Sequence, residues 1–333
     1  MGAACILGVE GHAVSKWEKT FFREADPWGF ILFARNIDTP AQVQKLTRDL
    51  RDAVGRNAPV LIDQEGGRVQ RLRAPHWREY LPALDQMNTA RDPLRAQWLR
   101  NRLIAEELRE VGIDVNCAPL ADLVEENTHA VLKNRLYSNR VEAVVQAAQA
   151  CADGLLAGGV LPVLKHLPGY GRAEVDSHLQ LPTVDVPKVD LEQRDFAPFK
   201  ALNHLPMGMT AHIVFSQIDP SAPATTSEIM MQLIREEIGF DGLIMSDDLS
   251  MQALTGSISE RAAGAVRAGC DLALHCNGVP GEMEMVVAAA GEMSAAARLR
   301  ADRALSLRQK PQSVDISSLE AEFEALLGEG PNG

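Results

Sequence analysis

The chain has 333 residues, of which 46% are hydrophobic, so it is long enough to bury one large core or two small ones. It contains 45 Asp and Glu residues against 33 Lys and Arg, which gives a formal net charge of −12. An acidic chain without a basic run is a poor candidate for binding nucleic acid or an anionic membrane surface. No apolar run in the sequence approaches the roughly 18 residues that a membrane-spanning helix needs.

The N-terminal apolar stretch, residues 3–9, predicts a first strand rather than a signal peptide, because no basic residue precedes it. The five cysteines are odd in number, widely spaced and without a CxxC motif. Four of them lie in or beside apolar runs. We therefore expect buried, reduced thiols in a cytoplasmic protein.

Eight short apolar runs recur along the chain, and longer segments with helical periodicity separate them. The runs are residues 6–9, 30–33, 60–62, 113–117, 160–164, 207–210, 243–245 and 271–275. The expected helices are residues 40–55, 92–112, 141–158, 191–203, 227–238, 257–268, 281–307 and 317–327. Strands that alternate with helices predict a parallel sheet.

Eight such units favour an α/β fold of the (β/α)₈, TIM-barrel type. We expect a single catalytic domain over residues 1–310, followed by a C-terminal helix and a frayed tail over residues 311–333. A doubly wound open sheet is the structural alternative, but it usually carries a Gly-rich phosphate turn after its first strand. Residues 8–12, Gly-Val-Glu-Gly-His, do not form that motif.

The most informative stretch is residues 233–250, in which an apolar strand leads into two carboxylates, Asp247 and Asp248. In α/β folds the C-terminal ends of the strands carry the chemistry. Side chains alternate between the two faces along a strand, so the two carboxylates should not point the same way. Asp247 shares its parity with Leu243 and Met245, which favours Asp247 as the inward-facing group.

Polar residues also follow two other predicted strands, where a polyhydroxylated ligand such as a sugar, or a phosphorylated ligand, would suit them. Asp63 is either a carboxylate in the active-site mouth or an ordinary exposed turn residue. Arg71 offers forked donors to a ligand or forms a surface ion pair. Lys165 can bind a hydroxyl group, act as a Schiff-base nucleophile or reach solvent. His166 is a ligand contact or a satisfied core histidine.

The connection from residue 167 to residue 182 is long and has no helical period, which is typical of functional loops. Within it, Asp176 precedes His178 by two residues. Such a carboxylate can fix the tautomer of the imidazole and raise its basicity, although an Asx-type turn with an incidental histidine has the same spacing. We expect neither a metal nor a cofactor, because His166 and His178 lack a third ligand at a recognisable spacing. A serine nucleophile is not indicated either, since no G-x-S-x-G motif appears.

Three motifs in this order resemble those of a known family. Residues 233–250, LIREEIGFDGLIMSDDLS, resemble the active-site signature of glycoside hydrolase family 3. Residues 165–171, KHLPGYG, with residues 176–182, DSHLQLP, resemble the pattern of its single-domain bacterial β-N-acetylglucosaminidases. Residues 63–73, DQEGGRVQRLR, are similar to the early-strand motif of the same group.

This resemblance implies roles for individual residues. Asp247 would be the nucleophile, His178 the general acid/base, and Asp176 the partner that orients His178. The residues that would hold N-acetylglucosamine are Asp63, Arg71, Arg135, Lys165 and His166. Arg135 occupies the family's arginine position, although Lys133 and Asn134 replace the usual Gly-Asp before it. Tyr170 stands where the family usually has a histidine, which would alter loop packing or aglycone contacts.

The resemblance also implies a function. The expected reaction is retaining release of N-acetylglucosamine from 1,6-anhydro-N-acetylmuramyl peptides, in cytoplasmic peptidoglycan recycling. We expect a sugar substrate, no nucleic-acid or membrane partner, and a monomer or weak homodimer. The alternatives are a phosphorylase of the same family, a Schiff-base aldolase that uses Lys165, and a sugar-binding barrel without activity.

Overall fold

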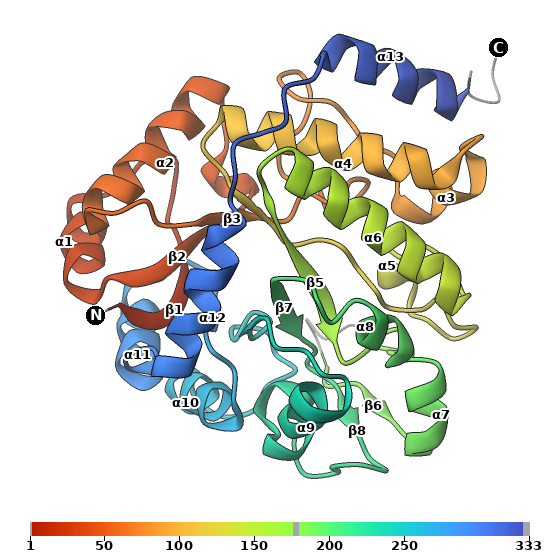
Figure 1. Ribbon diagram of the computed structural model, residues 1–333. Helices are drawn as coiled ribbons and strands as arrows, with labels where there is room; N and C mark the ends of the chain where they lie inside the picture. Colours follow the sequence, from red (N-terminus) through yellow and green to blue (C-terminus); the bar gives the residue numbers. More distant parts are fainter. Residues whose placement is uncertain (1, 176–179, 329–333) are drawn as a thin grey trace.

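The computed structural model of the chain describes residues 2–175 and 180–328. Each of the eight predicted runs overlaps one strand of the main sheet. These strands are β1 (Ala3–Gly8), β2 (Pro27–Leu32), β3 (Val60–Ile62), β4 (Val115–Asn116), β5 (Leu161–Leu167), β7 (Met207–Thr210), β9 (Leu243–Met245) and β10 (Ala273–His275). Figure 1 shows them near the centre of the molecule, with helices around them.

The sheet closes on itself. Its strands run parallel in the order β10-β1-β2-β3-β4-β5-β7-β9, so the first and last strands of the chain are neighbours, with Cys5 opposite Ala273. The remaining gap, between β9 and β10, is bridged by a hydrogen bond of 3.0 Å from Ser246 N to Leu272 O. The predicted (β/α)₈ barrel is confirmed, and the doubly wound alternative is wrong because it requires a sheet with open edges.

The helices mostly follow the predicted segments. They are α1 (Lys16–Ala25), α2 (Pro40–Val54), α3 (Ala83–Thr89), α4 (Pro93–Glu110), α5 (Ala130–Lys133), α6 (Val141–Ala157), α7 (Lys188–Gln193), α8 (Ala197–Ala201), α9 (Glu228–Gln232), α10 (Ile258–Ala268), α11 (Pro280–Ala290), α12 (Ala295–Ser306) and α13 (Ile316–Leu327). A π-helical turn, Leu233–Glu237, continues α9, and short 3₁₀ turns lie at Ala34–Asn36 and Ala224–Thr226.

Two predicted helices are each divided in the structure. The segment predicted as one helix over residues 281–307 forms α11 and α12, because the chain turns at Gly291 with φ 65 and ψ −154, a conformation that favours glycine. The segment predicted over residues 191–203 forms α7 and α8. Pro198 lies in the first turn of α8, where a missing backbone N–H is tolerated. In the interior of one continuous helix the same proline would remove a hydrogen bond, so the two helices are separate.

The sequence prediction missed α1, although its start signal is present. Ser15 and Glu18 form a capping box, in which Glu18 N donates to Ser15 Oγ at 3.1 Å and Ser15 N donates to Glu18 Oε2 at 2.8 Å. The prediction also missed the parallel pair β6 (Thr183–Val184) and β8 (Val214–Phe215), which lies outside the barrel. Strands of two residues are too short to show an alternating pattern.

The strands are buried, as their apolar composition predicts. All three residues of β9 have an exposed fraction of 0%. The five cysteines are also buried and free, so the prediction of buried thiols is confirmed.

The helix predicted at residues 317–327 is confirmed as α13, which lies alongside α4 (Figure 1). Phe323 of α13 is 2% exposed, and the centre of its ring lies 6.3 Å from that of Tyr80. At the edge of the contact, Arg95 Nε donates to Glu322 at 2.6 Å. The tail predicted after this helix includes residues 329–333, which lie outside the described part of the chain.

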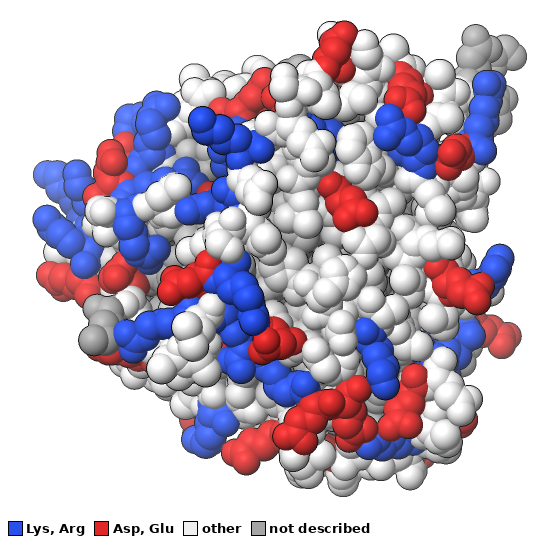
Figure 2. Space-filling model, in the orientation of Figure 1, with Lys and Arg blue, Asp and Glu red and all other residues white. Residues whose placement is uncertain are grey.

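The surface carries charges of both signs. On the face that Figure 2 shows, Lys and Arg side chains lie interspersed with Asp and Glu rather than in one continuous basic patch. Among the described helices, none combines the length and the hydropathy needed to cross a bilayer.

Asp271 stabilises the closure of the barrel and provides a test of it. Its carboxylate accepts hydrogen bonds from Arg235 at 2.7 Å, from Arg300 at 2.8 Å and from Ile244 N of β9 at 2.9 Å, and its side chain is 4% exposed. Asp271→Ala should lower the free energy of unfolding by about 3–5 kcal/mol, because two arginines lose a buried partner. Urea unfolding followed by circular dichroism measures this change.

The matched control is Asp241→Ala. Asp241 pairs with Arg303 at 2.9 Å, but its side chain is 72% exposed, so its loss should cost less than about 1 kcal/mol. Equal effects of the two substitutions would contradict the assignment of Asp271 to the closure.

Candidate active site

A cavity of about 270 Å³ lies at the C-terminal ends of the barrel strands. This volume lies just below the range of about 300–1,000 Å³ for ligand pockets, so the cavity suits a small ligand such as one sugar unit. Most of the predicted site residues line this cavity, and further polar residues lie among them. The polar lining residues are Asp63, Arg68, Arg71, His129, Arg135, Lys165, His166, Tyr170, Asp247, Asp248 and Cys276.

These residues meet because parallel strands end at the same edge of the barrel. Asp63 directly follows β3, and Asp247 follows β9 by two residues. Lys165 and His166 were expected after the end of a strand at residue 164. They lie within β5, which continues to Leu167, and both are nearly buried.

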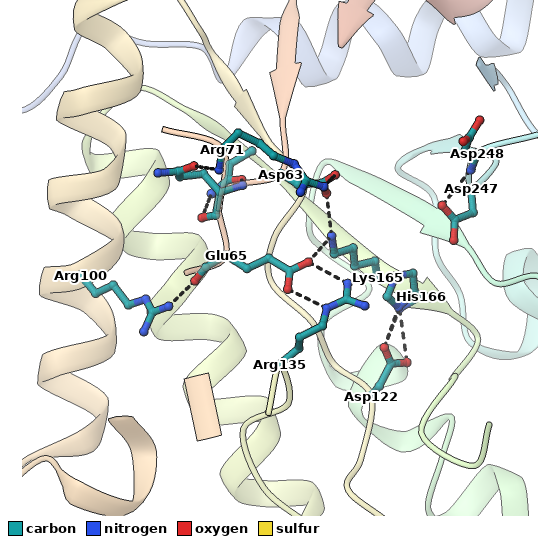
Figure 3. A network of polar contacts seen from close by, with 12 residues as sticks. Asp63, Glu65, Arg71, Arg100, Asp122, Arg135, Lys165, His166, Asp247 and Asp248 are labelled. Carbon is teal, nitrogen blue, oxygen red and sulfur yellow. Dashed lines mark hydrogen bonds and ion pairs between the residues drawn. The ribbon is translucent and has the colours of Figure 1, made fainter. Parts of the chain in front are cut away.

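Asp247 faces the cavity across from Lys165 and His166 (Figure 3). Its Oδ1 accepts a hydrogen bond from the backbone N–H of Asp248 at 2.8 Å. Burial favours the neutral acid, but the imidazoles of His212 and His166 outweigh it and hold the pKa of Asp247 below its ordinary value. The carboxyl group is therefore ionised near neutral pH, as a nucleophile requires.

Asp248 points in the opposite direction from Asp247, as strand alternation predicts (Figure 3). Its Oδ1 accepts hydrogen bonds from Ser250 N at 3.1 Å and from Cys276 N at 3.2 Å. Its backbone carbonyl oxygen lies 2.9 Å from Nε2 of the buried His212, and since a carbonyl only accepts, Nε2 carries the hydrogen. Asp248 and His212 thus fix the segment that holds Asp247.

A buried ion-pair network forms the opposite side of the cavity (Figure 3). The Nζ atom of Lys165 lies 3.0 Å from Asp63 Oδ1 and 2.6 Å from Glu65 Oε1. Arg71 pairs with Asp63 at 3.2 Å, and Arg135 donates to both oxygens of Glu65 at 2.9 and 2.8 Å. The structure therefore brings together four predicted binding residues, although their role in binding stays a prediction.

Opposite charges keep this network ionised. Burial alone would raise the pKa values of the two carboxyl groups, but Lys165 and Arg71 hold the pKa of Asp63 well below its usual range. Arg135 and Lys165 likewise lower the pKa of Glu65 to about 2. Burial would lower the pKa of Lys165, but the two carboxylates raise it above its ordinary value. Lys165 is thus an ammonium ion without the free electron pair that a Schiff base needs, which disfavours the aldolase alternative.

His166 forms a dyad with a fully buried carboxylate. Its Nδ1 lies 2.8 Å from Oδ2 of Asp122, whose side chain is 0% exposed. A carboxylate accepts, so Nδ1 carries the hydrogen and Nε2 is left for the cavity. Asp122 Oδ1 also accepts from Tyr170 N at 2.7 Å, and the rings of Tyr170 and His166 lie 5.5 Å apart. Tyr170, at the position where the family usually has histidine, therefore packs against this dyad.

The predicted pair Asp176 and His178 lies outside the described residues. Tyr170 and Val175, on the segment that leads to this pair, line the cavity. The loop predicted to carry catalytic groups thus borders the cavity up to residue 175.

Among the residues of the site to which the sequence assigned no role are Glu65 and Asp122. Glu65 had a signal in the sequence, because it follows Asp63 by two residues directly after a predicted strand, and alternate residues of an extended chain share a side. The pairing of Asp122 with His166 had no signal in the sequence, since the two residues lie 44 residues apart.

The pH dependence of stability at Glu65 provides a test of the ion-pair network. Its pKa is about 2 in the fold against an ordinary 4.5, so its contribution to stability is complete above about pH 4.5 and is lost as the pH falls toward 2. Glu65→Gln should lower the free energy of unfolding by about 3–5 kcal/mol at pH 7, because Arg135 and Lys165 lose a buried partner. Its stability should also fall less steeply than that of the wild type between about pH 5 and pH 3 in urea unfolding.

Glu79→Gln is the control, since its pair with Arg73 is half exposed and should be worth at most about 1 kcal/mol. A Glu65→Gln protein with wild-type stability at pH 7 would show that the network does not hold the site together.

Comparison with known proteins identifies the family. The glycosyl hydrolase family 3 N-terminal domain matches residues 15–305. A Beta-hexosaminidase of Alkalilimnicola ehrlichii is 39% identical over 284 residues, covering 82% of this chain and 80% of that protein. A Beta-hexosaminidase of Pseudomonas aeruginosa is 35% identical and covers 83% of both chains.

Solved structures agree. NagZ from Neisseria gonorrhoeae, in complex with N-trifluoroacetyl-D-glucosamine, is 31% identical with a TM-score of 0.83, over 98% of this chain and 96% of that chain. A family 3 β-N-acetylglucosaminidase from Paenibacillus is 29% identical with a TM-score of 0.82, over 99% of this chain but only 62% of that longer chain. The chain therefore belongs to glycosyl hydrolase family 3 and is a glycoside hydrolase of the β-hexosaminidase type.

Proposed function

We propose that the chain is a retaining exo-β-N-acetylglucosaminidase in which Asp247 is the nucleophile. The observation that carries this proposal is the ionised Asp247 carboxylate beside a cavity of about one-sugar size at the C-terminal end of the barrel. A nearly buried floor of ion-paired side chains leaves no path for a longer chain on that side, which favours removal of a terminal sugar.

The predicted binding residues offer complementary groups to one N-acetylglucosamine unit. Asp63 accepts hydrogen bonds from hydroxyl groups, whereas Lys165, Arg71 and Arg135 donate. Nε2 of His166 accepts in the neutral imidazole. The glucosamine derivative bound to the Neisseria gonorrhoeae relative supports this choice of sugar.

The reaction would proceed in two steps. In the first, a carboxylate oxygen of Asp247 attacks the anomeric carbon, the glycosidic bond breaks, and His178 gives its proton to the leaving oxygen. In the second, neutral His178 takes a proton from water, which attacks the anomeric carbon and releases Asp247 with overall retention. Asp176 would accept a hydrogen bond from His178 and set its tautomer. Val175, which precedes Asp176 in the sequence, lines the cavity, and this supports the assignment of Asp176 and His178.

We infer that the natural substrates are 1,6-anhydro-N-acetylmuramyl peptides that carry terminal N-acetylglucosamine, in cytoplasmic peptidoglycan recycling by a monomer or weak homodimer. The β-hexosaminidase relatives support the sugar, and the free buried cysteines suit a reducing compartment. Release of N-acetylglucosamine from such a muropeptide, followed by chromatography, tests the substrate.

Asp247→Asn should lower kcat on an aryl N-acetyl-β-glucosaminide by about 10⁴-fold or more, because no covalent ester can form. In the wild type, a 5-fluoro glycosyl fluoride should accumulate as an ester, and mass spectrometry of the digested protein should find the label on Asp247.

Asp190→Asn, which changes an exposed carboxylate, should keep wild-type kcat. Label on a residue other than Asp247, or near-normal turnover by folded Asp247→Asn, would refute the nucleophile assignment.

His178→Ala should lower hydrolysis by about 10²–10⁴-fold, since general acid–base help is lost. With an activated aryl leaving group the ester should still form, and added azide should speed turnover by giving a glycosyl azide of retained configuration. His204→Ala, at an exposed histidine, is the control. Equal rates in His178→Ala and wild type would exclude the role, and formation of a sugar 1-phosphate in phosphate buffer would identify a phosphorylase instead.

A further inference from the structure

The cavity has a buried base and an open rim. Lys165 and His166 at the base have side chains that are 2% and 8% exposed. Arg68 on the rim is exposed, and His129 is half-buried. A leaving group attached to a sugar at the base must therefore extend past the rim.

Arg68 differs from the other cations that line the cavity. Lys165, Arg71 and Arg135 all have carboxylate partners in Asp63 or Glu65. Within residues 2–175 and 180–328, Arg68 has no ion-pair partner. Its guanidinium group, with five donors in a planar fork, is therefore available to an anion from solution.

His129 presents a defined hydrogen-bond donor on the same rim. Its Nδ1 accepts a hydrogen bond from Val131 N at 3.3 Å, so the hydrogen of the ring lies on Nε2. Among the described residues, Nε2 has no hydrogen-bond or ion-pair partner. The backbone of His129 is held in place, because its N–H donates to Ala173 O at 3.0 Å.

Arg68 and His129 belong to segments that follow neighbouring strands of the barrel. Arg68 follows β3 and His129 follows β4, which are adjacent strands. The segments after them are joined by the ion pair of Glu65 with Arg135 and by a hydrogen bond of 3.2 Å from Leu84 N to Asn134 O.

We propose that Arg68 and His129 form a subsite for a carboxylate on the leaving group, so that the enzyme selects substrates with an anionic aglycone. The proposal rests on the proposed cleavage at Asp247, which places the aglycone at the rim. A guanidinium ion and an imidazole N–H both donate to carboxylate oxygens, and charge-assisted hydrogen bonds of this kind are stronger than neutral ones. Because the rim is open to solvent, added salt should weaken the selection.

The test compares two aryl N-acetyl-β-glucosaminides that differ only in a 3-carboxylate or a 3-carboxamide on a 4-nitrophenyl leaving group. The wild type should favour the carboxylate in kcat/KM by about tenfold or more at low ionic strength. Arg68→Gln and His129→Ala should each reduce this ratio by about five- to tenfold. Lys133→Gln removes an exposed cation from the same segment as His129, outside the cavity lining, and should keep the wild-type ratio.

Natural carboxylates could come from two places, which two further substrates distinguish. In N-acetylglucosaminyl-1,6-anhydro-N-acetylmuramic acid the lactyl carboxylate is free, whereas in the peptide-bearing form it is an amide and the carboxylates lie on the peptide. A loss in Arg68→Gln on the first substrate assigns the subsite to the lactyl group, and a loss on the second assigns it to the peptide.

A wild-type ratio near one, or ratios unchanged in both rim variants, would overturn the proposal. These outcomes are distinct from a failure of the proposed mechanism, which would appear as missing ester on Asp247 with either aryl substrate.

Discussion

The buried ammonium group of Lys165 lies between two carboxylates that follow another strand, and the rest of the site depends on this arrangement. An isolated charge is costly to bury, so each member of the network needs its partners. Asp63 and Glu65 hold Lys165, and these carboxylates are held in turn by Arg71 of the same segment and by Arg135 of the segment after β4. The charge balance therefore fixes the segments after β3 and β4 relative to β5. Three cations meet two carboxylates, and the positive excess faces Asp247.

Asp247 has no direct ion-pair partner among the described residues, and this distinguishes it from Asp63 and Glu65. Its pKa is held low by nearby charges and by one backbone N–H. A carboxylate tied into a salt bridge would be a poor nucleophile, since its electron pairs would already be shared. The fold instead orients Asp247 indirectly, through Asp248 and the His212 imidazole behind it. The fold thus positions Asp247 while its carboxylate stays without an ion pair to any described residue.

Much of the fold could be predicted from sequence because apolar runs and helical periods are local properties. The eight strands and the convergence of Asp63, Lys165 and Asp247 follow from this pattern alone. The division at Gly291 could not be predicted, because a glycine within a helical pattern is often tolerated. The dyad of His166 with Asp122 depends on the packing of two strands, and no spacing in the chain records it. The ion pair of Glu65 with Arg135, 70 residues away, likewise depends on how separate segments pack in the fold.

The distribution of charge in the cavity also resolves an apparent conflict with the composition. A chain with a net charge of −12 should repel an anionic substrate at long range. The Debye length is about 8 Å at physiological ionic strength, so groups at the cavity outweigh distant surface carboxylates for a ligand that has reached the rim. At the base each cation has a carboxylate partner, and the group that we propose it binds is a neutral hydroxyl group. Only at the rim, at Arg68, does a cation without such a partner among the described residues meet solvent. The proposed recognition of the sugar and the proposed recognition of charge are therefore separated along the depth of one cavity.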